Sequence, residues 1–156
     1  LMAGGSNADR EAAGTLLAWF GTVTLVGPLA AGHAMKALNN YVSAVGLLAS
    51  MQALATAESF GIAPETFTKV INGSTGRNNT TEVKLEPFII SRRYDSGFYL
   101  RLMAKDVGIA STLIKNAGFD APITAALNEY MESAVEHLGT DADHTRLYEM
   151  VNPAES

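Results

Sequence analysis

The longest helical pattern in the sequence opens with Gly32-His33-Ala34-Met35-Lys36-Ala37-Leu38-Asn39-Asn40. It starts at about Leu29 or Gly32 and continues to Phe60, where Gly61 ends it. Its apolar residues are spread nearly all round the predicted helix, which is typical of a helix at the centre of a bundle. We therefore predict a mainly α fold, a helical bundle around one long central helix.

Lys36 and Asn40 are the first candidates for chemistry on this helix. They are four residues apart, so they lie one turn apart on the same face. A lysine beside a carboxamide is able to hold a small hydroxy acid with the ammonium aimed at the reacting oxygen. Most lysines near helix starts are solvated surface charges, however, and this spacing also occurs by chance. The spacing alone leaves both interpretations open.

Length and composition limit the class of protein. The 156 residues fit one domain of ordinary size, and the 17% of charged residues is low for a free-standing surface, which favours a surface covered by a partner. A net charge of −5 argues against a nucleic-acid binder, and the absence of cysteine excludes disulfides and thiolate chemistry. The apolar run 42–57 contains several polar residues, so it predicts a buried helix and no membrane span.

The first 28 residues predict a strand, a helix and a second strand. Leu1–Ala3 has the character of a buried strand, a helix follows over about 8–20 with Asn7 or Asp9 as its cap, and Thr22–Val26 is short and β-branched. A strand without partners is unstable. We therefore expect residues 1–28 to be the tail of a truncated α/β domain, and residues 29–156 to form an all-helical domain.

The remainder of the chain predicts further helices. They cover 63–72, 81–91 with a break at Pro87, 99–117, 123–138 and 144–151, with a loop at 73–79. Lys105 lies deep in one apolar helix, where it must either reach the surface along its stem or be supported by an anion. Adjacent helical residues point about 100° apart, so we do not expect Lys105 to pair with Asp106.

Common catalytic signatures are absent from the sequence. It contains no G-x-G-x-x-G, P-loop, H-E-x-x-H or nucleophile elbow. The histidines at 33, 137 and 144 are too scattered to predict a metal site, and Glu58 is the one acidic residue far along the long helix. We therefore expect no metal.

Two sequence motifs follow one another along the chain, separated by the long helix. The first is Gly27-Pro28-x-x-x-Gly32-His33-x-x-Lys36-x-x-Asn39-Asn40, and the second, after the long helix, is Phe98-x-x-x-Leu102-x-x-Lys105-Asp106-Val107. Together they resemble the β-hydroxyacid dehydrogenase family, which includes 3-hydroxyisobutyrate dehydrogenase, tartronate semialdehyde reductase and relatives of 6-phosphogluconate dehydrogenase. The family's glycine-rich dinucleotide motif and Ser-Gly-Gly loop have no counterpart here, so the chain resembles a C-terminal fragment.

The resemblance implies a role for each motif residue. Lys36 matches the catalytic general acid/base, and Asn40, with Gly32 and Asn39 of the same motif, matches the substrate-binding positions. Lys105 matches a lysine that reaches the cofactor, NAD or NADP. The implied reaction is oxidation of a small 3-hydroxy acid to its semialdehyde by a cytoplasmic homodimer, with this fragment alone inactive because most of the nucleotide site is missing.

Two other interpretations remain open. A non-catalytic helical interaction module on the same scaffold would be expected to lose Lys36 or Asn40, and both are present. An imine or ketol-acid reductase would be expected to vary the lysine position or to carry acidic metal ligands on the long helix.

Overall fold

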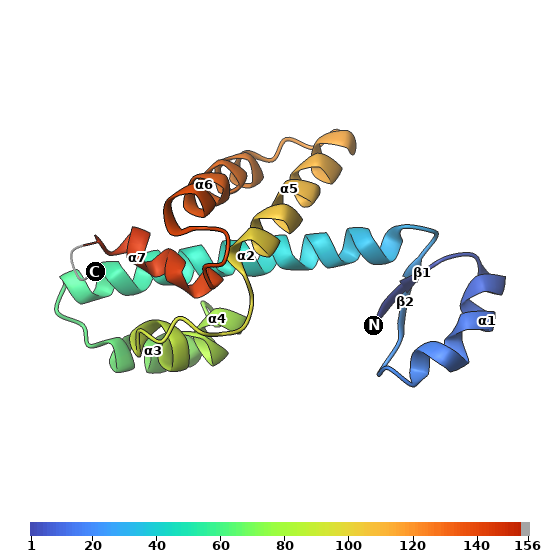
Figure 1. Ribbon diagram of the computed structural model, residues 1–156. Coiled ribbons are helices and arrows are strands. Elements are labelled where there is room, and N and C mark those ends of the chain that lie inside the picture. Colours follow the sequence, from blue (N-terminus) through green and yellow to red (C-terminus); the bar gives the residue numbers. More distant parts are fainter. Residues whose placement is uncertain (154–156) are drawn as a thin grey trace.

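The computed structural model describes residues 1–153 and confirms a mainly α fold around one long helix, α2 (Ala31–Ser59). Figure 1 shows α2 running across the molecule, with a small β-α-β unit at its N-terminal end and the other helices packed along the rest. Within the described residues, no helix is both long and apolar enough to cross a membrane. The division into residues 1–28 and 29–156 stays a prediction.

The β-α-β unit consists of β1 (Met2–Gly4), α1 (Asn7–Ala18) and β2 (Thr24–Gly27), and the two strands pair in parallel. The prediction of Asn7 or Asp9 as the helix cap was wrong. Ser6 is the cap: its Oγ accepts from the Asp9 backbone N–H, and the Asp9 carboxylate accepts from the Ser6 backbone N–H. This reciprocal pair satisfies two of the donors that a helix start leaves open.

The apolar side of α1 has no cover within residues 1–153. No residue of α1 is buried, and Trp19 beside it is 84% exposed. A two-stranded sheet with one uncovered helix has almost no core of its own. This unit is therefore held mainly by its contacts with the start of α2.

The core lies between α2, α5 (Leu100–Asn116) and α6 (Pro122–Leu138), with α5 packed on both neighbours. Figure 1 shows α5 and α6 on one side of α2, and α3 (Pro64–Asn72) and α4 (Asn79–Val83) on the other. Because helices cover α2 on more than one side, its small and apolar residues are buried along most of its length. The buried residues of α2 are Ala37, Ala44, Leu47, Ser50, Met51, Leu54 and Ala57.

The predicted helical break was placed at the wrong residue. The chain changes at Lys84 from α4 to a short π-helix, η1 (Leu85–Ile90), and Pro87 lies inside this wider turn. The Ile89 N–H reaches back to the Lys84 carbonyl, five residues earlier. Proline has no N–H and crowds the carbonyl four residues before it, so a wider turn accommodates it.

The C-terminal helix also divides in two. A 3₁₀ turn, η2 (His144–Arg146), leads into α7 (Leu147–Val151), where a single helix was expected. The buried Tyr148 of α7 donates its hydroxyl hydrogen bond to Glu58 at the end of α2. Burial, and then this bond, raise the pKa of Tyr148 well above its usual value. Glu58 therefore ties the two ends of the bundle together.

Candidate active site

One buried carboxylate, that of Asp106 on α5, gathers three of the predicted site residues. Its Oδ2 accepts hydrogen bonds from Lys36 Nζ and from Asn40 Nδ2, each at 2.6 Å. Its Oδ1 lies 2.8 Å from Lys105 Nζ. The Asp106 side chain is only 4% exposed, whereas those of Lys36 and Lys105 are 53% and 57% exposed. The cluster is thus a buried anion with two cations reaching solvent above it.

The expectation that Lys105 and Asp106 do not pair was wrong. Adjacent side chains leave a helix in different directions, but the four-carbon stem of Lys105 is long enough to bring its ammonium back to Asp106. The half-exposed side chain also shows that Lys105 reaches the surface along its stem.

Asp106 stays ionised because its donors outweigh its burial. Burial raises the pKa of Asp106, while hydrogen bonds from Lys105, Lys36 and Asn40 lower it, and the net result is a pKa below the usual value. The sequence did not lead us to predict that Asp106 links the other residues of the site. The available signal was an acidic residue in an otherwise apolar helix, since a buried charge needs partners.

A cavity of about 470 Å³ opens beside Lys36 and Asn40. Its volume falls in the range of small-molecule sites. Residues of α2, of α4 and η1, of the segment before α5, and of η2 line it: Lys36, Asn40, Ser43, Val83, Lys84, Phe88, Ser96, Phe98, Met103 and His144. Lys36, Asn40 and Ser43 of α2 therefore form one wall of this cavity.

The structure does not bring Asn39 and Gly32 into this cavity. Asn39 is exposed and donates a 3.3 Å hydrogen bond to Asn40 Oδ1. Gly32 borders a smaller hollow of about 270 Å³ beside β1, which it shares with Lys36. Lys36 thus lies between two hollows. The substrate-binding roles of Gly32 and Asn39 stay predictions.

Gly32 has a packing role that can be tested. A Cβ at Gly32 would lie 2.5 Å from the backbone oxygen of Met2, closer than any ordinary contact. We expect Gly32→Ala to push β1 away from α2 and to lower the free energy of unfolding by about 1–3 kcal/mol. Urea titration measures the loss, with Gly14→Ala, which has open space around its Cβ, as the control. An unchanged midpoint for Gly32→Ala would contradict this.

His144 forms the inner wall of the cavity and was not predicted to belong to the site. It is 1% exposed, and its Nδ1 lies 3.0 Å from the Phe98 carbonyl oxygen and 3.2 Å from Ser96 Oγ. A carbonyl only accepts hydrogen bonds, so Nδ1 carries the proton and Nε2 is bare in the neutral ring. Burial, and then the charge of Lys84, lower the pKa of His144 to about 4.

This lowered pKa predicts a loss of stability in mild acid. The unfolded chain protonates His144 below about pH 6.5, while the folded protein resists protonation until about pH 4. Its contribution is therefore complete above pH 6.5 and is lost as the pH falls towards 4, by about 3 kcal/mol in all. Urea unfolding between pH 4.5 and 7.5 measures the slope, which His144→Gln should remove. An equal slope in that variant would contradict the prediction.

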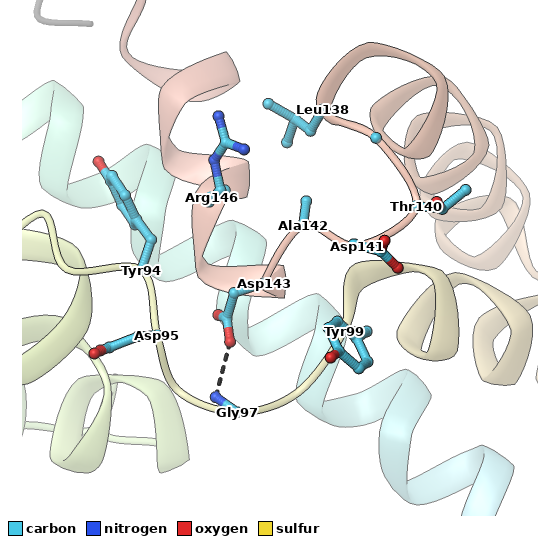
Figure 2. Close-up of a pocket in the computed structure, with 11 residues that line it drawn as sticks. Tyr94, Asp95, Gly97, Tyr99, Leu138, Thr140, Asp141, Ala142, Asp143 and Arg146 are labelled. Atoms are coloured by element: carbon cyan, nitrogen blue, oxygen red, sulfur yellow. Dashed lines mark hydrogen bonds between the residues drawn. The ribbon is translucent and has the colours of Figure 1, made fainter.

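A second and larger hollow, about 720 Å³, lies on the other side of the segment that leads into α5. Figure 2 shows its lining, with the Gly97 N–H donating to Asp143 at 2.9 Å. Its other charged side chains are partnered within the protein: Asp95 by Arg93, Asp141 by Arg101 and Arg146 by Glu149. The charged side chains of this hollow are therefore less available to bind a ligand than those of the cavity beside Lys36.

Comparison with known proteins agrees with this geometry. Residues 30–151 match the family described as NAD-binding of NADP-dependent 3-hydroxyisobutyrate dehydrogenase. The chain is 32% identical over 133 residues to 2-(hydroxymethyl)glutarate dehydrogenase of Eubacterium barkeri, covering 85% of this chain and 44% of that protein. It is 28% identical to 2-hydroxy-3-oxopropionate reductase of Escherichia coli strain K12, covering 94% of this chain and 50% of the reductase.

A solved structure shares the fold. It is that of 3-hydroxyisobutyrate dehydrogenase of Mycobacterium tuberculosis with L-serine, with a TM-score of 0.84 and 25% identity over 95% of this chain and 53% of the other. The chain thus spans about half the length of the relatives that it matches. The match over residues 30–151 shows that the chain belongs to the β-hydroxyacid dehydrogenase family, and the solved structure shares its fold.

Proposed function

We propose that this chain is the C-terminal half of an NAD(P)-dependent 3-hydroxyacid dehydrogenase, which oxidises a small 3-hydroxy acid to its semialdehyde. Residues 29–156 would form the helical domain and residues 1–28 the end of the dinucleotide-binding domain. The observation that carries the proposal is the pairing of Lys36 and Asn40 with one buried carboxylate beside a cavity of small-molecule size.

Lys36 is the proposed general acid/base. Oxidation of an alcohol sends a hydride to the nicotinamide cofactor and a proton to a base, and the cofactor supplies only the hydride acceptor. The uncharged Lys36 amine takes the alcohol proton, and in reduction its ammonium returns the proton and stabilises the negative charge on the carbonyl oxygen. Asn40, with one N–H held by Asp106, has its second Nδ2–H for a substrate oxygen.

The cofactor assignment rests on the family, whose description names NAD binding. The position of Lys36 between the cavity and the smaller hollow fits a residue that must reach substrate and cofactor together. Lys105, half exposed above Asp106, is the residue of this chain proposed to contact the cofactor.

A homodimer is also proposed, supported by exposed apolar side chains on α2 such as Met35 and Val42. A cytoplasmic location stays a prediction.

The test is a steady-state assay of the full-length protein with NAD and NADP. The substrates are 3-hydroxyisobutyrate, 2-(hydroxymethyl)glutarate and, for the reverse reaction, 2-hydroxy-3-oxopropionate. We expect cofactor-dependent turnover of at least one acid, and none by the chain of residues 1–156 alone. The absence of turnover on every substrate in the full-length protein would overturn the proposal and favour a non-catalytic module.

A further inference from the structure

The cavity beside Lys36 is lined by a second lysine, Lys84, at the junction of α4 and η1. Its ammonium makes no hydrogen bond or ion pair with any side chain or carbonyl among residues 1–153. The side chain is half-buried, and this burial lowers the pKa of Lys84. A cation that is partly removed from water without a hydrogen-bond acceptor is unfavourable, and the charge of Asp143 offsets only part of this cost, so its position requires a further explanation.

A carboxylate near Lys84, that of Asp143, favours the charged form of the lysine without pairing with it directly. Lys36 and Lys84 are the only fully charged residues that line the cavity, and Lys36 is already paired with Asp106. The nearby Asp143 is engaged elsewhere. Its two oxygens accept hydrogen bonds from the Ser96 hydroxyl, from the backbone N–H groups of 97 and 98, and from the backbone and hydroxyl of Thr145. Asp143 therefore offsets the Lys84 charge electrostatically but accepts no hydrogen bond from it, so the N–H donors of Lys84 have no acceptor among the described residues.

His144 gives a second and independent indication. Its Nε2 is buried and has no hydrogen-bond partner among the described residues, although most buried polar atoms have one. His144 lines the same cavity as Lys84. An ammonium has three N–H donors, enough to serve Nε2 of His144 and a carboxylate of a ligand together. Nε2 accepts a hydrogen bond and does not contact the anion, but a carboxylate held by Lys84 would fix the ammonium that donates to Nε2.

The remainder of the lining suggests what joins this anion to the reacting end. The lining also includes the apolar side chains of Val83, Phe88, Phe98 and Met103, which suit a short hydrocarbon spacer. A single ammonium suits a carboxylate better than a phosphate, whose three oxygens usually engage several donors.

We propose that the substrate is a dicarboxylic 3-hydroxy acid whose second carboxylate binds the Lys84 ammonium in this cavity. The proposal rests on the proposed function for the reacting end of the substrate. It assigns Lys84 as a specificity-determining residue, with His144 as the polar wall beside it.

The test compares acids that differ only at the distal group. The dicarboxylates are 2-(hydroxymethyl)succinate and 2-(hydroxymethyl)glutarate, and their monocarboxylic partners are 2-(hydroxymethyl)butanoate and 2-(hydroxymethyl)pentanoate, in which a methyl replaces the carboxylate. Affinity is measured by titration calorimetry and kcat/KM by the NAD(P) assay, both on the full-length protein. A charge-assisted hydrogen bond predicts that at least one dicarboxylate binds about 10- to 100-fold more tightly than its partner.

Variants assign this preference to Lys84. Lys84→Met should remove the preference by lowering affinity for the dicarboxylates much more than for the monocarboxylates, while Lys84→Arg should retain it. Lys115→Met, which removes the same charge from the exposed end of α5, should change neither.

Two results would overturn the proposal: equal affinity for the paired acids, or an equal loss for both classes in Lys84→Met. Calorimetry needs no turnover, so it separates a failure of this proposal from a failure of the dehydrogenase assignment. A protein that binds dicarboxylates through Lys84 but oxidises none supports the subsite and contradicts the proposed reaction.

Discussion

Replacing Lys36 by methionine is expected to lower kcat about 100- to 10,000-fold, the range for loss of a positioned proton-transfer group. The side chain is half-exposed, so its removal should leave folding intact. In the proposed mechanism most of the cofactor is bound by the other half of the protein, so its dissociation constant should change little. Steady-state kinetics and a fluorescence titration of NAD(P)H measure the two quantities.

Lys36→Arg separates proton transfer from positive charge. Arginine is able to pair with Asp106, but its guanidinium does not give up a proton in proteins, so this variant should be nearly as impaired as Lys36→Met. Lys115→Met controls for loss of a lysine. Activity that persists in Lys36→Met would remove Lys36 from the chemical step, and activity that persists only in Lys36→Arg would leave it an electrostatic role.

The sequence predicted the architecture well because its strongest signals are local. The long apolar pattern predicted α2 almost to the residue, since Gly61 ends it and helices on several sides keep it apolar. Errors arose where a detail depends on hydrogen bonds between backbone and side chain. Ser6 rather than Asn7 caps α1, and the chain widens at Lys84 rather than breaking at Pro87.

The site was less predictable because its parts come from distant elements. Lys36 and Asn40 share one helix face, so their spacing placed them together. Their common partner, Asp106, lies on α5, and Lys84 and His144 lie on two further elements. No periodicity within one helix brings such residues together. The Lys105-Asp106 pair was visible, but its geometry was misjudged because the reach of a lysine stem was not considered.

Replacing Asp106 by asparagine is the second large expected effect. Asparagine has nearly the same shape, so it leaves no cavity, but it has one acceptor oxygen and a donor amide where the carboxylate accepts three hydrogen bonds. At least one of Lys36 and Lys105 then loses its anchor. Loss of a charge-assisted bond predicts a fall in kcat of about 10- to 100-fold, measured by steady-state kinetics, with little change in KM for the cofactor.

The variant also has an expected pH signature. Because the folded pKa of Asp106 is lowered, its ionised form stabilises the folded protein above about pH 4, and this contribution is lost as the pH falls further. Asp106→Asn should therefore unfold at a lower urea concentration than wild type at pH 7, and the difference should shrink in acid.

Asp141→Asn, at an exposed carboxylate 3.7 Å from Arg101, is the matched control and should change neither kcat nor stability. A loss of stability with unchanged kcat would show that Asp106 holds the fold together without positioning Lys36. A loss of kcat that accompanies the loss of stability, while KM for the cofactor is retained, would show that the buried carboxylate serves the reaction through the lysine it holds.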